Sequence, residues 1–242
     1  MNPNVLTVYT SPFKKIRLGK PYDGGYIIVD IPRVQYSTLL AGGISTDSSF
    51  EEHFMYTYPN VSAFAFDGTI EALPKTNKKI TFIQKNIGSV NTHDTTNLHD
   101  IINATEKIFV KMDIEGGEIP WIKSLTDEHM NKFEQIVMEF HNPFTEEEVD
   151  VFSKINKNHV LVHFHGNNCC EFRNHKGVMI PNIFECTYLH KKYFISAPLL
   201  NTEVIPGNLD MKNVIQNEEL QIDYPPFVSA RKKITIRRLR YI

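Results

Sequence analysis

The sequence predicts an α/β protein with a doubly wound, mostly parallel, Rossmann-like sheet and an antiparallel hairpin at one edge. Three observations predict it: apolar runs of strand length recur along the 242 residues, each run ends at small or polar residues, and helix-like segments separate most of them. Because α/β folds of this size often form one unit, we expect one domain over residues 1–200, with a short N-terminal lead-in. A C-terminal extension, 201–242, is expected to pack on it.

The predicted strands are rich in β-branched and aromatic residues and stop at turns. The first five are residues 37–40, 61–66, 80–84, 107–112 and 135–140. A sixth strand, 160–164, leads into a polar loop, and a seventh, 182–189, returns beside it as the hairpin.

Helices are expected between these strands because parallel pairing needs crossover connections. Asp47 or Ser48 is a suitable N-terminal cap for the first, and a Thr145-Glu146-Glu147-Glu148 pattern opens the last. The predicted helices are residues 47–57, 92–104, 115–123 and 145–155.

Charge and cysteine content exclude several protein classes. The 26 basic and 28 acidic residues give a formal net charge of −2, so no broad positive field exists to hold nucleic acid, and a basic run is confined to residues 231–240. Three cysteines are too few for a disulfide framework. We expect a cytoplasmic protein without a membrane span or signal peptide, of undetermined oligomeric state.

The first predicted strand ends in Gly42 and Gly43 and passes into a predicted helix at Asp47. Glycines at such a turn let backbone amides approach a ligand, and a helix N-terminus favours an anionic group. Asp67 ends the next strand, where nucleotide-type folds place an acidic residue on the ribose, although Asp67-Gly68 is equally a turn signal. Because no GxxxxGK[ST] and no complete GxGxxG lies near these strands, the pattern favours S-adenosylmethionine.

The most distinctive stretch is Lys111-Met112-Asp113-Ile114-Glu115-Gly116-Gly117-Glu118, where a hydrophobic strand ends in three carboxylates and two glycines. Open α/β sheets bind ligands at this end of their strands. The stretch resembles the acidic signature of the FkbM-type S-adenosylmethionine-dependent methyltransferases, and residues 17–191 resemble that family throughout. Supporting motifs are Asp23-Gly24-Gly25-Tyr26, Ala41-Gly42-Gly43, Phe66-Asp67-Gly68, Glu139-Phe140-His141, His163-Phe164-His165-Gly166-Asn167-Asn168 and Glu185-Cys186-Thr187.

The resemblance implies a class I methyltransferase fold, with S-adenosylmethionine and its product S-adenosylhomocysteine over the ends of the first, second and fourth strands. It implies that Gly42 and Gly43 pass under the methionine part and that Asp67 holds the ribose. The glycine motif differs from the commoner family wording, so the anchor of the methionine amino end stays open between Asp23 and Asp113. The cofactor-binding candidates are Asp23, Gly24, Gly42, Gly43, Asp47, Asp67, Gly68, Asn86, Ile87, Gly88 and Asp113.

Methyl transfer to a hydroxyl requires a group that removes the hydroxyl proton. The candidates at the strand ends are Asp113, Glu139, His141 and His165. The two histidines are expected on an open rim as bases, because an ordinary histidine titrates near neutral pH. Glu139 is alternatively a partner that orients a histidine, and His163 is expected to pack within the sheet.

A divalent metal ion could also be bound by Asp113, Glu139 and His141. Because Mg²⁺ prefers oxygen ligands and one of the three is a histidine, the residues favour a general base over a metal-dependent mechanism. Glu115, Asn167 and Asn168 are the candidates for binding the acceptor, and the hairpin turn is the structural alternative for both asparagines.

The sequence therefore predicts an O-methyltransferase that acts on a sugar hydroxyl of a glycan or glycoconjugate, a carbohydrate acceptor that the family resemblance implies. One alternative is a non-catalytic carbohydrate-binding or assembly protein with this fold, which a cleft filled by the C-terminal extension would indicate. The other is a methyltransferase for RNA, protein or a small phenol.

Overall fold

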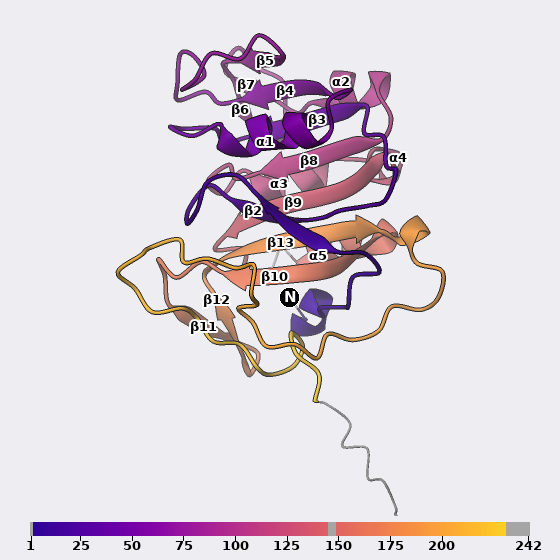
Figure 1. Cartoon of the computed structure of the whole chain (residues 1–242), viewed down its shortest axis with the longest axis vertical. Coiled ribbons are helices and arrows are strands. Elements are labelled where there is room, and N and C mark those ends of the chain that lie inside the picture. Colours follow the sequence, from indigo (N-terminus) through magenta and orange to yellow (C-terminus); the bar gives the residue numbers. More distant parts are fainter. Residues whose placement is uncertain (1, 145–148, 231–242) are drawn as a thin grey trace, which may run out of the picture.

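A seven-stranded sheet forms the centre of the computed structural model, which describes residues 2–144 and 149–230 (Figure 1). The strand β13 is antiparallel to both of its neighbours, and every other neighbouring pair in this sheet is parallel. The prediction of a doubly wound, mostly parallel sheet with an antiparallel hairpin at one edge is confirmed. Along the sheet the strands are β10 (His159–Gly166), β13 (Ile183–His190), β9 (Phe133–His141), β8 (Ile108–Met112), β3 (Thr38–Gly42), β4 (Ser62–Phe66) and β5 (Ile80–Ile83).

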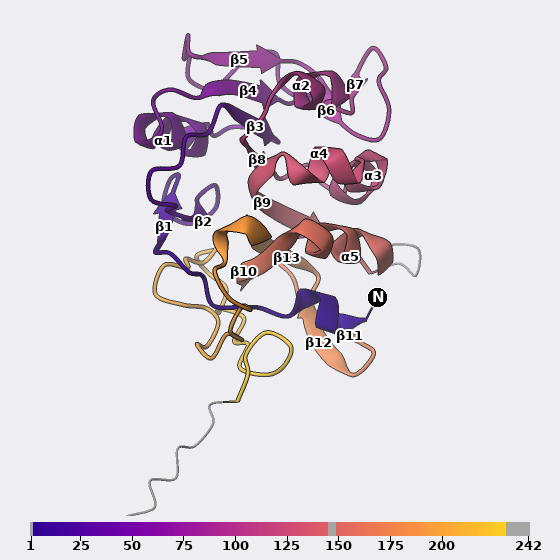
Figure 2. The same ribbon diagram turned by 90° about the vertical axis from the view of Figure 1, so that its right-hand side faces the viewer.

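Two apolar layers cover the two faces of this sheet. Figure 2 shows one layer formed by α1 (Ser49–Thr57) and the hairpin of β1 (Lys15–Leu18) and β2 (Tyr26–Val29). The opposite layer contains α2 (His99–Ala104), α3 (Glu118–Ser124), α4 (Asp127–Asn131) and α5 (Val149–Asn158), together with the 3-10 helix η1 (Pro3–Leu6). A second 3-10 helix, η3 (Lys191–Tyr193), follows β13.

The β1–β2 hairpin is fixed to the sheet by buried polar side chains. The Gln135 side chain accepts a hydrogen bond from Val29 N at 2.6 Å and donates one to Val29 O at 3.0 Å. Further along, Thr187 Oγ1 donates to Ile27 O at 2.5 Å. These bonds hold Tyr26 above the end of β8, where its hydroxyl donates to Asp113 Oδ2 at 2.7 Å.

The predicted helix over residues 92–104 is wrong in its first half. Residues 95 and 96 form the short strand β7 (Thr95–Thr96), paired with β6 (Asn86–Ile87), and only α2 is helical. Side chains that compete for the backbone explain this: Thr92 Oγ1 accepts from Asp94 N at 3.2 Å and from Thr95 N at 3.0 Å, which fixes a turn. The predicted cap of α5, residues 145–148, lies outside the described residues.

The C-terminal extension packs against the sheet as far as residue 230. After the small hairpin of β11 (Phe172–His175) and β12 (Val178–Pro181), and after β13, the chain crosses the edge beyond β10 (Figure 1). Ile205 pairs with Ile222 in an isolated bridge, and Ile222 and Phe227 are fully buried. We call residues 201–230 the C-terminal strap. In the described ranges, no helix combines the length and the apolar character that a membrane crossing needs.

Candidate active site

The glycine turn after β3 lies directly against the end of β8. Gly43 has φ +74°, and a Cβ atom there would lie 1.5 Å from Asp113 O, so no side chain fits. A Cβ at Gly42 would lie 2.5 Å from Ile87 Cδ1, which closes that position to a ligand. Lys111 Nζ, from β8, donates to Gly43 O at 2.9 Å and so holds the turn in place. Of the two glycines, Gly43 therefore borders the open side.

Asp67 organises the same turn from the end of β4. Its Oδ2 accepts from Ile44 N at 3.0 Å and from Ser45 N at 2.8 Å, while Oδ1 accepts from Thr69 N at 2.7 Å and from Thr69 Oγ1 at 2.6 Å. Burial alone raises the pKa of Asp67, but these hydrogen bonds outweigh it, and the pKa is lowered. The carboxylate therefore both makes the turn with Gly68 and supports the glycine loop.

Two adjoining cavities open around this turn. One, of about 230 Å³, extends past Asp67 between the ends of β4 and β8, and the other, of about 90 Å³, extends toward α1. They share the residues Gly43, Ser45 and Asp113. The larger cavity is also lined by Phe66, Asp67, Thr69, Asn86, Ile87, Ile114 and Glu115, and the smaller by Lys20, Asp23, Gly24, Tyr26, Ile44, Thr46, Asp47, Phe50, Glu51 and Lys111.

The walls of the cavities are fixed by local hydrogen bonds. Gly68 N donates to Asn86 Oδ1 at 3.1 Å, and Gly88 N donates to Thr96 O at 3.0 Å, so these two glycines support the wall that Asn86 and Ile87 form. On the other side, Asp47 Oδ1 accepts from Ser49 N at 3.2 Å, and Lys20 Nζ lies 3.5 Å from Asp47 Oδ2. Gly24, with φ +88°, lets the loop that carries Asp23 pass over Asp47.

The acidic turn after β8 is built around Glu118, which the sequence prediction left out of the site. Its fully buried carboxylate accepts from Ile114 N at 3.1 Å and from Gly116 N at 3.1 and 3.3 Å. Glu115 and Gly116 both have positive φ, so helix α3 begins at Glu118 rather than at the predicted residue 115. An acidic residue in the first helical turn, directly after the Gly116-Gly117 pair, was the available signal.

His141, at the end of β9, extends into this carboxylate cluster. Its Nδ1 donates to Glu118 Oε1 at 3.0 Å, and its Nε2 lies 3.7 Å from Asp113 Oδ1 and 3.5 Å from Glu115 Oε2. Burial lowers the pKa of His141, but Glu118, Glu139 and Asp113 more than compensate and raise it to about 9. The surrounding carboxylates therefore favour the protonated form of His141.

Three titratable side chains lie opposite one another on neighbouring strands. Glu139 on β9 pairs in register with Glu185 on β13, which pairs with His165 on β10. Burial, together with the charges of Asp113 and Glu185, raises the pKa of Glu139 well above its usual range. Asn167 Nδ2 donates to Glu139 Oε1 at 2.7 Å. Glu139 therefore holds a proton more tightly than an ordinary glutamate.

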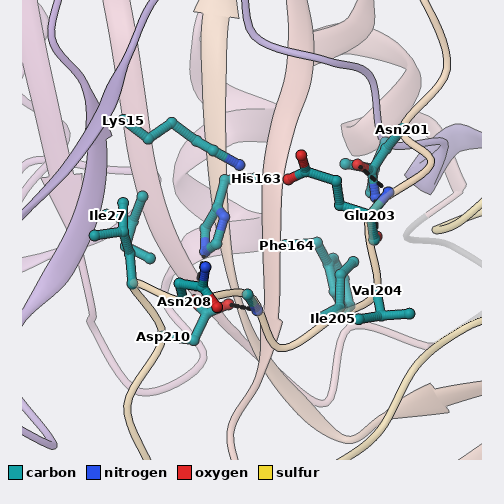
Figure 3. Close-up of a pocket in the computed structure, with 13 residues that line it drawn as sticks. Lys15, Ile27, His163, Phe164, Asn201, Glu203, Val204, Ile205, Asn208 and Asp210 are labelled. Atoms are coloured by element: carbon teal, nitrogen blue, oxygen red, sulfur yellow. Dashed lines mark hydrogen bonds and ion pairs between the residues drawn. The ribbon is translucent and has the colours of Figure 1, made fainter.

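A β-bulge in β10 determines where its two histidines point. The register shifts between Leu161 and His163, which turns His163 and His165 toward the face of Glu185. His163, 7% exposed, packs on the sheet with Nε2 3.0 Å from Asp210 Oδ1, beside Lys15 and the chain segment around Glu203 (Figure 3). Burial raises the pKa of Asp210, but the interactions with His163 and His165 and the hydrogen bond from Gly207 N together outweigh it and lower the pKa to about 2.

The C-terminal strap covers the predicted acceptor side. His165 is 1% exposed, with Nε2 3.4 Å from Glu219 Oε2 and Nδ1 3.7 Å from Glu185 Oε2. Burial lowers the pKa of His165, but these two glutamates raise it to about 10. The side chain of Asn168 bonds to both backbone groups of Val214 at 2.8 and 2.9 Å. His165 thus lies beneath the strap rather than on an open rim, and Asn168 anchors the strap.

Comparison with known proteins assigns this chain to no family. No protein-family model matches the sequence, and no curated protein matches it. Among solved structures, the fibrillarin/Nop5p complex covers 64% of this chain and 72% of its own at 10% identity, with a TM-score of 0.39. The Methanococcus jannaschii fibrillarin pre-rRNA processing protein covers 66% and 69% at 10% identity, TM-score 0.38. Precorrin-6y C5,15-methyltransferase from Geobacter metallireducens covers 66% and 82% at 10% identity, TM-score 0.38.

Likenesses at these TM-scores carry no argument about function, so the chemistry must be inferred from the site itself. The ends of β3, β4 and β8 bring together Gly43, Asp67 and Asp113, and β9 adds Glu139 and His141 beside them. The cluster carries more carboxylates than cations. Such a site favours a positively charged ligand over an anionic one.

Asp113, Glu139 and His141 are also close enough to hold a metal ion. One ligand atom from each lies within 4.8 Å of the others. The imidazole has its other nitrogen on Glu118, the second-sphere arrangement that metal-bound histidines commonly have. Two carboxylate groups and one imidazole suit Mn²⁺ or Zn²⁺ better than Mg²⁺.

Proposed function

We propose that this protein is an S-adenosylmethionine-dependent O-methyltransferase of the FkbM type, acting on a hydroxyl of a sugar. The observation that carries the proposal is the pair of adjoining cavities that share Gly43, Ser45 and Asp113. An adenosyl amino acid has the same division, with a nucleoside at one end and a zwitterion at the other.

The residues present fit this cofactor. Asp67, Asn86 and Ile87 would hold the adenosine end in the larger cavity, and Asp23 and Asp47 border the smaller, charged cavity for the methionine end. When bound, S-adenosylmethionine supplies a methyl group activated on a sulfonium cation. The excess of carboxylates around Asp113 supports binding of that positive charge.

His141 is the group proposed to take the acceptor proton. Its Nδ1 is fixed by Glu118, which leaves Nε2 as the atom that faces Asp113 and Glu115. Nε2 must be unprotonated to act, and the surrounding carboxylates oppose this in the ligand-free protein. Once those carboxylates face a second cation, the proton on His141 is held less tightly, so cofactor binding prepares the base.

The sugar acceptor rests on the family resemblance and on polar groups at the mouth of the site. The Glu115 side chain is 84% exposed at the turn after β8, next to His141. A carboxylate there can accept hydrogen bonds from sugar hydroxyls, whereas Asn167 is buried, with Nδ2 donating to Glu139 Oε1 at 2.7 Å and Oδ1 accepting from Cys169 N at 2.9 Å. Asn168 is excluded from this set because its side chain is committed to the strap.

The alternative hypothesis, a non-catalytic carbohydrate-binding or assembly protein with this fold, is not favoured. It requires the C-terminal strap to fill the cofactor site, but the residues that line the two cavities lie between positions 20 and 115. The strap covers the end of β10 and the start of β13 instead.

A metal-assisted form of the same reaction has one observation in its favour, the grouping of Asp113, Glu139 and His141. A bound divalent ion would lower the pKa of the acceptor hydroxyl, and no separate base would be required. A chelator then separates the two forms: it abolishes turnover in the metal-assisted form and leaves the base-catalysed form active.

The proposal is tested by incubating the protein with S-adenosylmethionine and a panel of sugars, glycans, RNA, peptides and phenols, with and without chelator. Mass spectrometry should detect a gain of one methyl group on a sugar. Methylation of a peptide, RNA or phenol instead would contradict the proposal of a sugar acceptor. Absence of methylation with every acceptor would contradict the proposal that the protein is a methyltransferase.

A further inference from the structure

Glu51, in the first turn of α1, is a buried carboxylate with an unused oxygen. It is 1% exposed, it lines the 90 Å³ cavity, and its Oε1 has no hydrogen-bond partner among the described residues. Buried polar atoms in folded proteins nearly always have a partner, because an unpaired one loses its hydration without compensation. An unpaired carboxylate oxygen at a cavity wall therefore points to a missing donor.

The neighbouring charged groups do not supply that donor. Lys111 raises the positive potential near Glu51, but its Nζ is committed to the backbone oxygens of Gly43 at 2.9 Å and Gly42 at 3.4 Å. Lys20 Nζ forms an ion pair with Asp47 Oδ2 at 3.5 Å, and Lys75 Nζ forms one with Glu52 Oε2 at 2.7 Å. Burial raises the pKa of Glu51, and Asp47 and Glu52 add to that rise, while Lys111 and a backbone hydrogen bond of Glu51 itself oppose it.

We propose that Glu51 binds the α-ammonium group of the methionine end of S-adenosylmethionine. This rests on the proposed function and replaces the two candidates drawn from sequence, Asp23 and Asp113. An ammonium group offers three donors and a positive charge, which are what a buried, unpaired carboxylate lacks. Asp113 is less available because the Tyr26 hydroxyl already donates to it at 2.7 Å.

The assignment makes Glu51 the residue that selects adenosyl ligands by their amino group. The carboxylate end of the same zwitterion would lie toward Lys20, the partly exposed cation on the cavity wall. Thioether nucleosides without an amino acid, such as 5′-methylthioadenosine, use only the larger cavity and do not contact Glu51. Binding of the two ligand types should therefore depend differently on this side chain.

The test is calorimetric titration of the full chain with S-adenosylhomocysteine, its analogue without the α-amino group, and 5′-methylthioadenosine. For the wild type, the amino group should improve affinity roughly ten- to a hundredfold. In Glu51→Gln, which keeps the side-chain size, affinity for S-adenosylhomocysteine should fall to that of the deaminated analogue. Affinity for 5′-methylthioadenosine should stay within about twofold.

Glu52→Gln is the matched control, because it removes a neighbouring carboxylate that faces Lys75 instead of the cavity. It should bind all three ligands as the wild type does. Equal discrimination for the amino group in wild type and Glu51→Gln overturns the assignment and leaves the proposed function intact, as does a parallel loss of all three ligands in Glu51→Gln. Absence of binding by the wild type overturns both.

Discussion

The two halves of the carboxyl-end edge of the sheet use similar residues in opposite ways. At the ends of β3, β4 and β8, Glu51 keeps an unpaired oxygen and two cavities adjoin Asp113. At the end of β10 and the start of β13, His165 and Glu185 are buried and bonded to the strap through Glu219 and Asn213. Residue type alone does not separate a functional group from a structural one, whereas the identity of its bonding partners does.

The same difference in bonding partners distinguishes His141 from His165. His141 has one nitrogen fixed by Glu118 and the other beside an exposed carboxylate, so it can meet a ligand. His165 has both nitrogens within ion-pair distance of glutamates and is 1% exposed. We therefore expect variants on the two sides to show distinct defects, in activity on one side and in stability on the other.

The largest effect is expected for Gly43→Ala. The added Cβ would overlap Asp113 O, and alanine is unfavourable at the positive φ of this position. The turn between the cavities must therefore move, and binding of S-adenosylhomocysteine should be lost. Gly177→Ala is the control, because Gly177 also has positive φ, +85°, but an added Cβ there meets nothing within 4 Å. It should cost only about 1 kcal/mol of folding free energy in urea unfolding. Equal binding by both variants would contradict the assignment.

The next effect is the loss of activity in His141→Ala. Removing a general base typically lowers the rate by about 10² to 10⁴, and cofactor affinity should change little because the cavities keep their lining. Single-turnover kinetics with saturating cofactor measures this. A rate within threefold of the wild type would eliminate His141 as the base.

His165→Ala should show the reverse pattern. It leaves the buried Glu185 and the partly buried Glu219 without their cation, which should lower the free energy of unfolding by about 3 kcal/mol. The rate per folded molecule should stay within about threefold. A large rate loss at unchanged stability would show that the strap side takes part in the chemistry.

A smaller effect is a shift in the pH profile. His141 acts only when unprotonated, and its pKa is raised to about 9 in the protein without cofactor, so kcat/KM for S-adenosylmethionine should rise with pH and level off above about 9. Glu118→Gln removes the carboxylate that bonds to Nδ1, which lowers the pKa of His141 and moves the rise to lower pH. An unchanged profile in Glu118→Gln would disprove this coupling.

The sequence predicted the sheet and its strand ends because apolar runs followed by turns are a local property. It also placed Gly43, Asp67, Asp113 and His141 at one edge, which follows from parallel strand order. It did not predict that Asn168 and His165 lie under the strap, because partners such as Val214 and Glu219 are more than 40 residues away in sequence.

Local sequence also misled where side chains compete with the backbone. Thr92 fixes a turn inside an expected helix, and Glu118 delays the start of α3 by accepting from Gly116 N. The unpaired oxygen of Glu51 is a property of packing, so no pattern in the sequence indicates it.

The most direct test of the account is calorimetric titration of the wild type with S-adenosylmethionine, S-adenosylhomocysteine, ATP and NAD. Heat of binding is expected with the two adenosyl compounds only, and Asp67→Ala should weaken both because it removes the support of the glycine turn. Absence of heat with both adenosyl compounds, or undiminished affinity in Asp67→Ala, would contradict the claim that the cavities at Gly43 and Asp113 form the cofactor site.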